Sequence, residues 1–98
     1  MKKINLVFGY EYKHADILLV PNAIADDLDA VVQEFFRWIG NPANNKRFLV
    51  PHNGEMVLSV GTDEFLWWIN RYKTTDEDAA VILERDTRAV RDYPTADF

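Results

Sequence analysis

The 98-residue sequence contains no cysteine and only one serine. Without cysteine the chain has no disulfide, no thiolate nucleophile and no cysteine-ligated zinc site. The single serine, Ser59, lies in a predicted strand and is not flanked by the Gly-x-Ser-x-Gly pattern of a nucleophile elbow. The four glycines are isolated, so no glycine-rich phosphate loop is present. These absences predict a protein that is not an enzyme.

Long apolar runs are also missing. No stretch approaches the roughly 20 apolar residues that a membrane-spanning helix needs. The chain begins Met1-Lys2-Lys3, but the apolar stretch that follows is too short for a signal peptide. The sequence therefore predicts a cytoplasmic protein that does not associate with a membrane.

Charge of one sign is in excess, and the excess is uneven. The net charge is −5. Residues 1–50 carry six basic and six acidic side chains, whereas residues 51–98 carry five basic and ten acidic ones. No basic stripe is present, so nucleic acid is not an expected partner. A negative surface instead favours basic protein partners.

The order of apolar patterns predicts one α+β domain over residues 1–98. Alternation over residues 3–8 predicts a half-buried strand, and the continuous apolar run 16–21 predicts a more central one. Apolar side chains at helical spacing predict an amphipathic helix from Ile24 to Ile39, which ends at Gly40.

The second half predicts a hairpin and a second helix. The apolar runs 47–50 and 56–60 flank Asn53-Gly54, a pair typical of a tight hairpin turn. Met56, Leu58 and Val60 are expected to face the core. Residues 62–72 then form the second helix, with Thr62 as its N-cap.

Two interpretations remain for residues 76–93. The acidic start and the late arginines favour a third helix. The alternative is a short buried strand over residues 80–84, because Val81, Ile82 and Leu83 are consecutive. Residues 95–98 are expected to be a loose tail, although Phe98 could dock. The predicted architecture is a four-stranded, mainly antiparallel sheet with two or three helices on one face, in the order ββαββα plus a C-terminal helix.

Trp67 is the residue that fits this pattern least. On the helix over residues 62–72, Trp67 lies opposite the apolar face and among polar side chains. Either the third helix covers it, or Trp67 and Arg71, one turn apart, form an exposed cation–π pair that serves as a protein-binding hot spot.

Tyr10 and Tyr12 bracket Glu11 in the first connection and point the same way if the segment is extended. Tyrosine is favoured at interfaces because it combines a large apolar ring with a polar tip. The alternative is that Tyr10 continues the first strand and packs inward. The candidate partner-binding residues are thus Trp67, Arg71, Tyr10 and Tyr12.

A metal site is not predicted. His14 and His52 both fall in predicted connections, and no ligand spacing brings them together with a carboxylate. The acidic cluster at residues 26–29 lacks the alternate spacing and central glycine of a calcium loop. No cofactor or metal is therefore expected.

These features predict a small acidic protein-interaction module that binds a basic partner, the class to which immunity proteins, antitoxins and nuclease inhibitors belong. One alternative is a homo-oligomer, such as a homodimer with an isologous contact around Trp67. Another is a small-molecule-binding domain with a pocket between sheet and helices, lined by Trp38, Trp68 and Tyr72.

Overall fold

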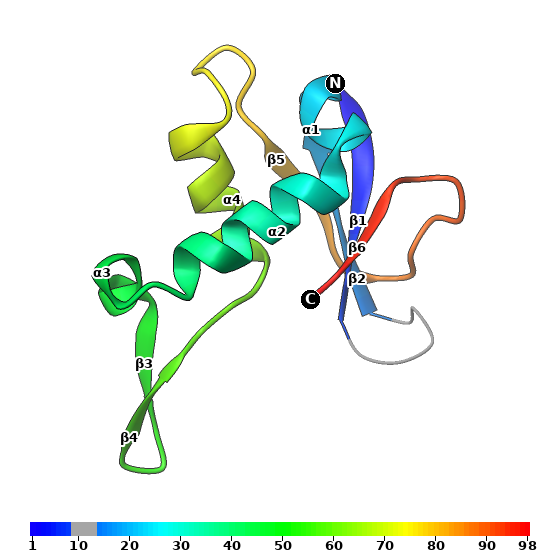
Figure 1. Ribbon diagram of the computed structural model, residues 1–98. Coiled ribbons are helices and arrows are strands. Elements are labelled where there is room, and N and C mark those ends of the chain that lie inside the picture. The colour runs from blue at the N-terminus through cyan, green and yellow to red at the C-terminus, as the bar shows by residue number, and fades with distance from the viewer. Residues whose placement is uncertain (9–13) are drawn as a thin grey trace.

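The computed structural model describes residues 1–8 and 14–98 (Figure 1). This part of the chain contains two separate β-sheets and four α-helices. The elements are, in order, β1 (Lys2–Phe8), β2 (His14–Val20), α1 (Asn22–Asp26), α2 (Leu28–Ile39), α3 (Pro42–Asn45), the 3₁₀ turn η1 (Lys46–Phe48), β3 (Leu49–His52), β4 (Glu55–Leu58), α4 (Thr62–Tyr72), β5 (Val81–Thr87) and β6 (Thr95–Asp97). The predicted α+β class is confirmed.

The larger sheet has four strands in the order β5-β2-β1-β6. β1 runs antiparallel to β2, and β2 runs antiparallel to β5, whereas β6 is parallel to β1. The sheet is therefore mixed. β1 was expected to be half-buried, but the four consecutive residues 4–7 are all buried. Since neighbouring side chains point to opposite faces, both faces of β1 are covered.

The predicted hairpin forms, but it does not belong to the larger sheet. Asn53 and Gly54 have φ angles of 50° and 79°, as a two-residue turn with two positive φ angles requires. Among the described strands, β3 and β4 pair only with each other, and they project away from the rest of the domain (Figure 1). The expectation that Met56 faces the core is wrong, because its side chain is 59% exposed. Leu58 and Val60, nearer the domain, do pack against the core.

The third helix predicted over residues 76–93 is absent, and a strand forms instead. It is longer than the alternative over residues 80–84 and is mostly exposed, not buried, with Val81 and Leu83 at 46% and 44%. β5 begins at Val81, and Leu18 and Leu19 of β2 pair with Ile82 and Val81. The edge of β2 offers backbone hydrogen-bond partners to residues 81–87. Pairing with β2 therefore outweighs the local preference of this segment for a helix. The acids of residues 76–78 form a turn before β5.

The predicted loose tail is also a strand. β6 (Thr95–Asp97) completes the larger sheet beside β1. The ring of Phe98 docks among four other phenylalanines at centroid distances of 5.3–6.1 Å, namely Phe8, Phe35, Phe36 and Phe65. The aromatic side chain that follows β6 is thus part of the core.

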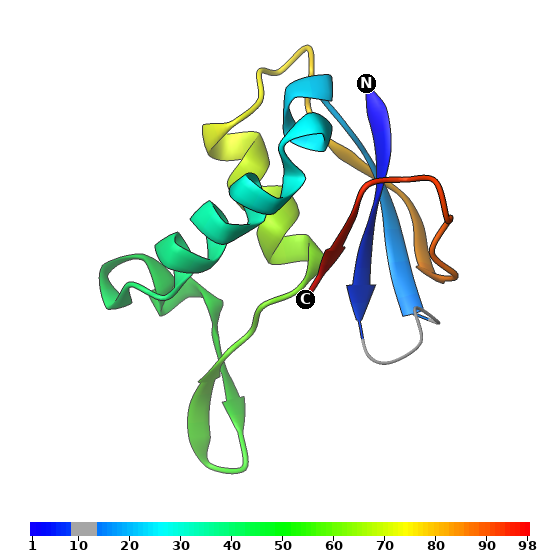
Figure 2. The same ribbon diagram turned by 45° about the vertical axis from the view of Figure 1, so that its right-hand side comes forward.

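The first predicted helix is divided in two at Asp27, whose φ and ψ of −130° and 37° are not helical. α2 and α4 then lie on the same side of the larger sheet (Figure 2). Leu28, Val32, Phe35 and Ile39 are the buried residues of α2, spaced by three or four. In the described residues, no helix is long and apolar enough to cross a membrane.

Candidate protein-interaction site

α4 is held in the domain by its inner face. Phe65, Trp68 and Ile69 are buried in the core. At its start, the Thr62 hydroxyl donates a hydrogen bond to Asp16 of β2 at 2.5 Å. Thr62 was expected to be the N-cap, but Gly61 takes that position without a side-chain cap. The inner contacts leave Trp67 and Arg71 on the outer side of the helix.

Trp67 is half-buried, and its partial cover comes from elements that precede α4. Its ring lies 6.0 Å from the ring of Trp38, at the end of α2, and 5.5 Å from that of Phe48 in η1. Tyr72, 6.4 Å away, completes this group. Residues 76–93 form no helix over Trp67, so that explanation of its position is wrong.

Two guanidinium groups flank the Trp67 ring. The guanidinium carbon of Arg71 lies 5.6 Å from the ring centroid, which is the pair expected from the one-turn spacing. Arg47 of η1 lies closer, at 4.3 Å. Arg47 was missed from the sequence because nothing local relates it to Trp67. A cation over an indole ring adds electrostatic attraction to the packing.

An open groove runs along α4 beside Trp67. It has a volume of about 600 Å³ and is lined by Asp63, Leu66, Trp67, Asn70 and Arg71. We call it the α4 groove. Asp63, on one side of the groove, is hydrogen-bonded to Arg85 of β5. The Arg85 guanidinium donates to both carboxylate oxygens of Asp63, at 2.7 and 3.3 Å. This hydrogen bonding and the positive charge of Arg85 hold the pKa of Asp63 below its usual value.

Asn70 ties the segment after α4 back to the helix. Its amide donates to the Ala80 carbonyl at 2.9 Å, and the Ala80 N–H donates to the Asn70 oxygen at 2.8 Å. The Thr74 hydroxyl donates to the same oxygen at 3.0 Å. These bonds fix both ends of the segment that carries Asp76, Glu77 and Asp78, which we call the acidic turn.

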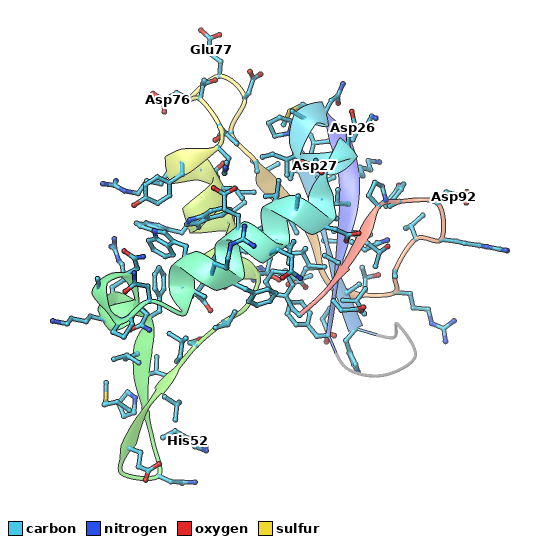
Figure 3. All side chains as sticks on the ribbon, in the orientation of Figure 1. Asp26, Asp27, His52, Asp76, Glu77 and Asp92 are labelled. Carbon is cyan, nitrogen blue, oxygen red and sulfur yellow. The ribbon has the colours of Figure 1, made fainter. Side chains whose placement is uncertain are left out.

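The acidic turn is exposed, and none of its three carboxylates forms an ion pair with another described residue. Figure 3 shows Asp76 and Glu77 at the same end of the molecule as Asp26 and Asp27. His52, at the tip of the hairpin, lies at the opposite end. These four carboxylates thus lie at one end of the domain, where Asp26 is paired with Lys2.

The remaining candidates from the sequence are two tyrosines and two histidines. Tyr10 and Tyr12 lie outside the described residues. Nδ1 of His14 lies 2.6 Å from a carboxylate oxygen of Asp86, and the ring of His52 is hydrogen-bonded to the neighbouring Asn53. Across residues 1–8 and 14–98, no group of three or more histidine and carboxylate side chains is arranged to hold a metal ion.

The rings expected around a small-molecule pocket pack against one another instead. The Tyr72 ring lies 5.7 Å from Trp38 and 6.3 Å from Trp68. Trp68 is only 2% exposed and also contacts Phe35. Its indole N–H is buried without a hydrogen-bond acceptor among the described residues.

Comparison of the chain with protein-family models, with curated proteins and with solved structures found no match.

Proposed function

We propose that this protein is a small acidic interaction module that binds a basic protein partner, in the manner of an immunity protein, antitoxin or inhibitor, without a catalytic step of its own. One observation supports this proposal most. The α4 groove is lined in part by Trp67, and the acidic turn is hydrogen-bonded to the same helix.

Trp67 has the properties of a binding hot spot. Hot spots are enriched in tryptophan and arginine, and they pair with pockets on the partner. The rings of Trp38 and Phe48 support Trp67 from within, so little side-chain freedom remains to be lost on binding. Arg71 adds a planar group that can donate several hydrogen bonds at the edge of the groove.

The charges divide the surface into two parts. Arg47 and Arg71 beside Trp67 repel basic side chains, so an apolar or acidic side chain of the partner is expected in the α4 groove. The partner's basic side chains are expected to meet the acidic turn, which has no cation of its own among the described residues. The net charge of −5 would also speed the encounter with a positively charged protein.

Capture of partners from the native host tests this proposal. The immobilised protein is expected to recover a protein of net positive charge at low salt, and less of it at high salt, because exposed charges are screened. Trp67→Ala should reduce the recovery about tenfold or more, as for a hot-spot residue. Met56→Ala is the matched control, since Met56 is an exposed apolar side chain on the distant hairpin.

The proposal fails if the recovered proteins are acidic, or if Trp67→Ala and Met56→Ala reduce the recovery equally. A toxin or nuclease gene directly beside the gene for this chain would identify the partner to be tested first. Purified partner and protein can then be titrated directly at two salt concentrations.

A further inference from the structure

Two arginines lie against the Trp67 ring beside the α4 groove, although the protein is acidic. Arg47 and Arg71 both lie within 6 Å of the Trp67 ring centroid, at 4.3 and 5.6 Å. Neither guanidinium forms an ion pair with another described residue, in contrast to Arg85, which is paired with Asp63. Each arginine therefore has hydrogen-bond donors that can still engage a carboxylate, and such bonds are stronger than those between neutral groups.

The acidic turn has the opposite character. Asp76, Glu77 and Asp78 are three consecutive exposed carboxylates. Their segment is tied to α4 at both ends, because Asn70 bonds to Thr74 at one end and to Ala80 at the other. A fixed segment loses less conformational freedom when it docks than a disordered one would.

We propose that two copies of this chain form a reciprocal homodimer, in which the acidic turn of each copy docks on Arg47, Trp67 and Arg71 of the other. The two features are complementary in charge and are carried by one chain. Two-fold symmetry uses each of them twice, because in an isologous contact residue i meets j while j meets i. Tyr72, 52% exposed beside Trp67, adds apolar area to the contact.

The dimer does not depend on the basic partner proposed above, since it needs only the purified chain. It is expected to be salt-sensitive, because its attraction comes from exposed charges. Raising the salt from about 0.1 M to about 1 M shortens the screening length from about 10 Å to about 3 Å, which should move the population toward monomer.

A charge exchange between the two features tests the proposal by sedimentation at low salt. The groove variant carries Arg47→Glu and Arg71→Glu. In a dimer of this variant, the new glutamates of one copy repel the acidic turn of the other copy. The turn variant carries Asp76→Lys, Glu77→Lys and Asp78→Lys. In a dimer of this variant, the lysines of one copy repel Arg47 and Arg71 of the other copy. Each variant alone should dimerise at least about tenfold more weakly than the original protein, as expected for like charges brought together.

The equimolar mixture of the two variants is the decisive sample. In a mixed dimer the acidic turn of the groove variant meets native arginines, and the lysine turn meets the new glutamates, so both contacts are attractive. Dimer should therefore return in the mixture, which also shows that both variants are folded. The single change Arg37→Glu, at an exposed cation outside the α4 groove, should leave dimerisation unchanged.

Three results would overturn the homodimer. The original protein could remain monomeric at low salt over a wide concentration range. It could associate to the same extent at low and high salt. The mixture of folded variants, with folding checked by circular dichroism, could contain only monomer. None of these results bears on the capture of a basic partner, so the two proposals can fail separately.

Discussion

At the scale of single residues, Asn5 is the most deeply buried polar residue among those that the structure describes, with an exposed fraction of 0%. Its amide donates to the Val90 carbonyl at 2.9 Å, and its oxygen accepts from the Val90 N–H at 3.0 Å. The amide also donates to the Thr95 hydroxyl at 3.0 Å. One side chain thereby attaches the segment before β6 to the centre of the larger sheet.

Asn5→Ala is expected to lower the free energy of unfolding by about 1–3 kcal/mol, because it leaves polar groups without their partners. Urea unfolding monitored by circular dichroism measures the loss. Gln33→Ala is the control, since Gln33 is an exposed amide on α2 and makes no hydrogen bond to a described side chain. Equal stability of the two variants would show that the Asn5 bonds contribute nothing.

The Asp63–Arg85 pair predicts a pH dependence. Arg85 lowers the pKa of Asp63 below 3.8, so the stabilisation is fully present above that pH and is lost as Asp63 becomes protonated below it. Arg85→Ala should therefore be less stable than the original protein at neutral pH, and the difference should vanish in acid. Urea unfolding between about pH 6 and about pH 2.5 covers the ordinary range of an aspartate.

Arg88→Ala is the control for this experiment, because Arg88 is exposed and forms no ion pair with a described residue. Its effect on stability should not change with pH. A difference between Arg85→Ala and the original protein that persisted at the acid limit would contradict the assignment to the ion pair.

Part of the site could be predicted from the sequence because it depends on neighbours along one helix. Trp67 and Arg71 are one turn apart, and a helical wheel places both on the outer side of α4. The contacts of Arg47 and Phe48 with Trp67 depend on how η1 packs against α4, and no local pattern carries that information. The sequence therefore predicted the proximity of Trp67 and Arg71, but it missed the second arginine and the rings that half-bury Trp67.

At the scale of elements, local and non-local information separate in the same way. The Asn53-Gly54 turn was predicted because it needs only two residues that tolerate positive φ. Which strands share a sheet depends on pairing across the chain. β2 recruits β5, and β1 recruits the three-residue β6, so the hairpin is left outside the larger sheet. The prediction of a helix over residues 76–93 was wrong because it did not include the pairing of β5 with β2.

β6 provides a direct test at this scale. Phe98→Ala removes a ring that contacts four phenylalanine rings of the core. We expect a loss of about 2–3 kcal/mol in the free energy of unfolding, somewhat below the 3–5 kcal/mol typical of fully buried phenylalanines. Asp97→Ala, an exposed change at the neighbouring last residue of β6, is the control. A loss of less than about 0.5 kcal/mol, the usual effect of a surface change, would mean that Phe98 is not docked.

At the scale of the whole molecule, the exposed carboxylates of the acidic turn and the aromatic surface around Trp67 occupy different places on the domain. The acidic turn and residues 26–27 lie toward one end, and the hairpin projects at the other (Figures 1 and 3). The α4 groove lies on the outer side of α4, where Arg47 of η1 reaches the Trp67 ring. A basic partner attracted by the acidic end can reach the aromatic groove, because α4 carries the groove and Asn70 fixes the acidic turn to it. The same surfaces serve the proposed homodimer, so partner and second copy should compete.

The most direct test of the interaction surface is amide hydrogen exchange of the protein with and without the captured basic partner, at a concentration where the protein alone is monomeric. Slower exchange is expected in α4, in η1 and in residues 74–80, which together frame the α4 groove and the acidic turn. The hairpin over residues 49–58 should exchange as it does in the free protein. Slowing confined to the hairpin or to β6, with α4 and the acidic turn unchanged, would contradict the proposal.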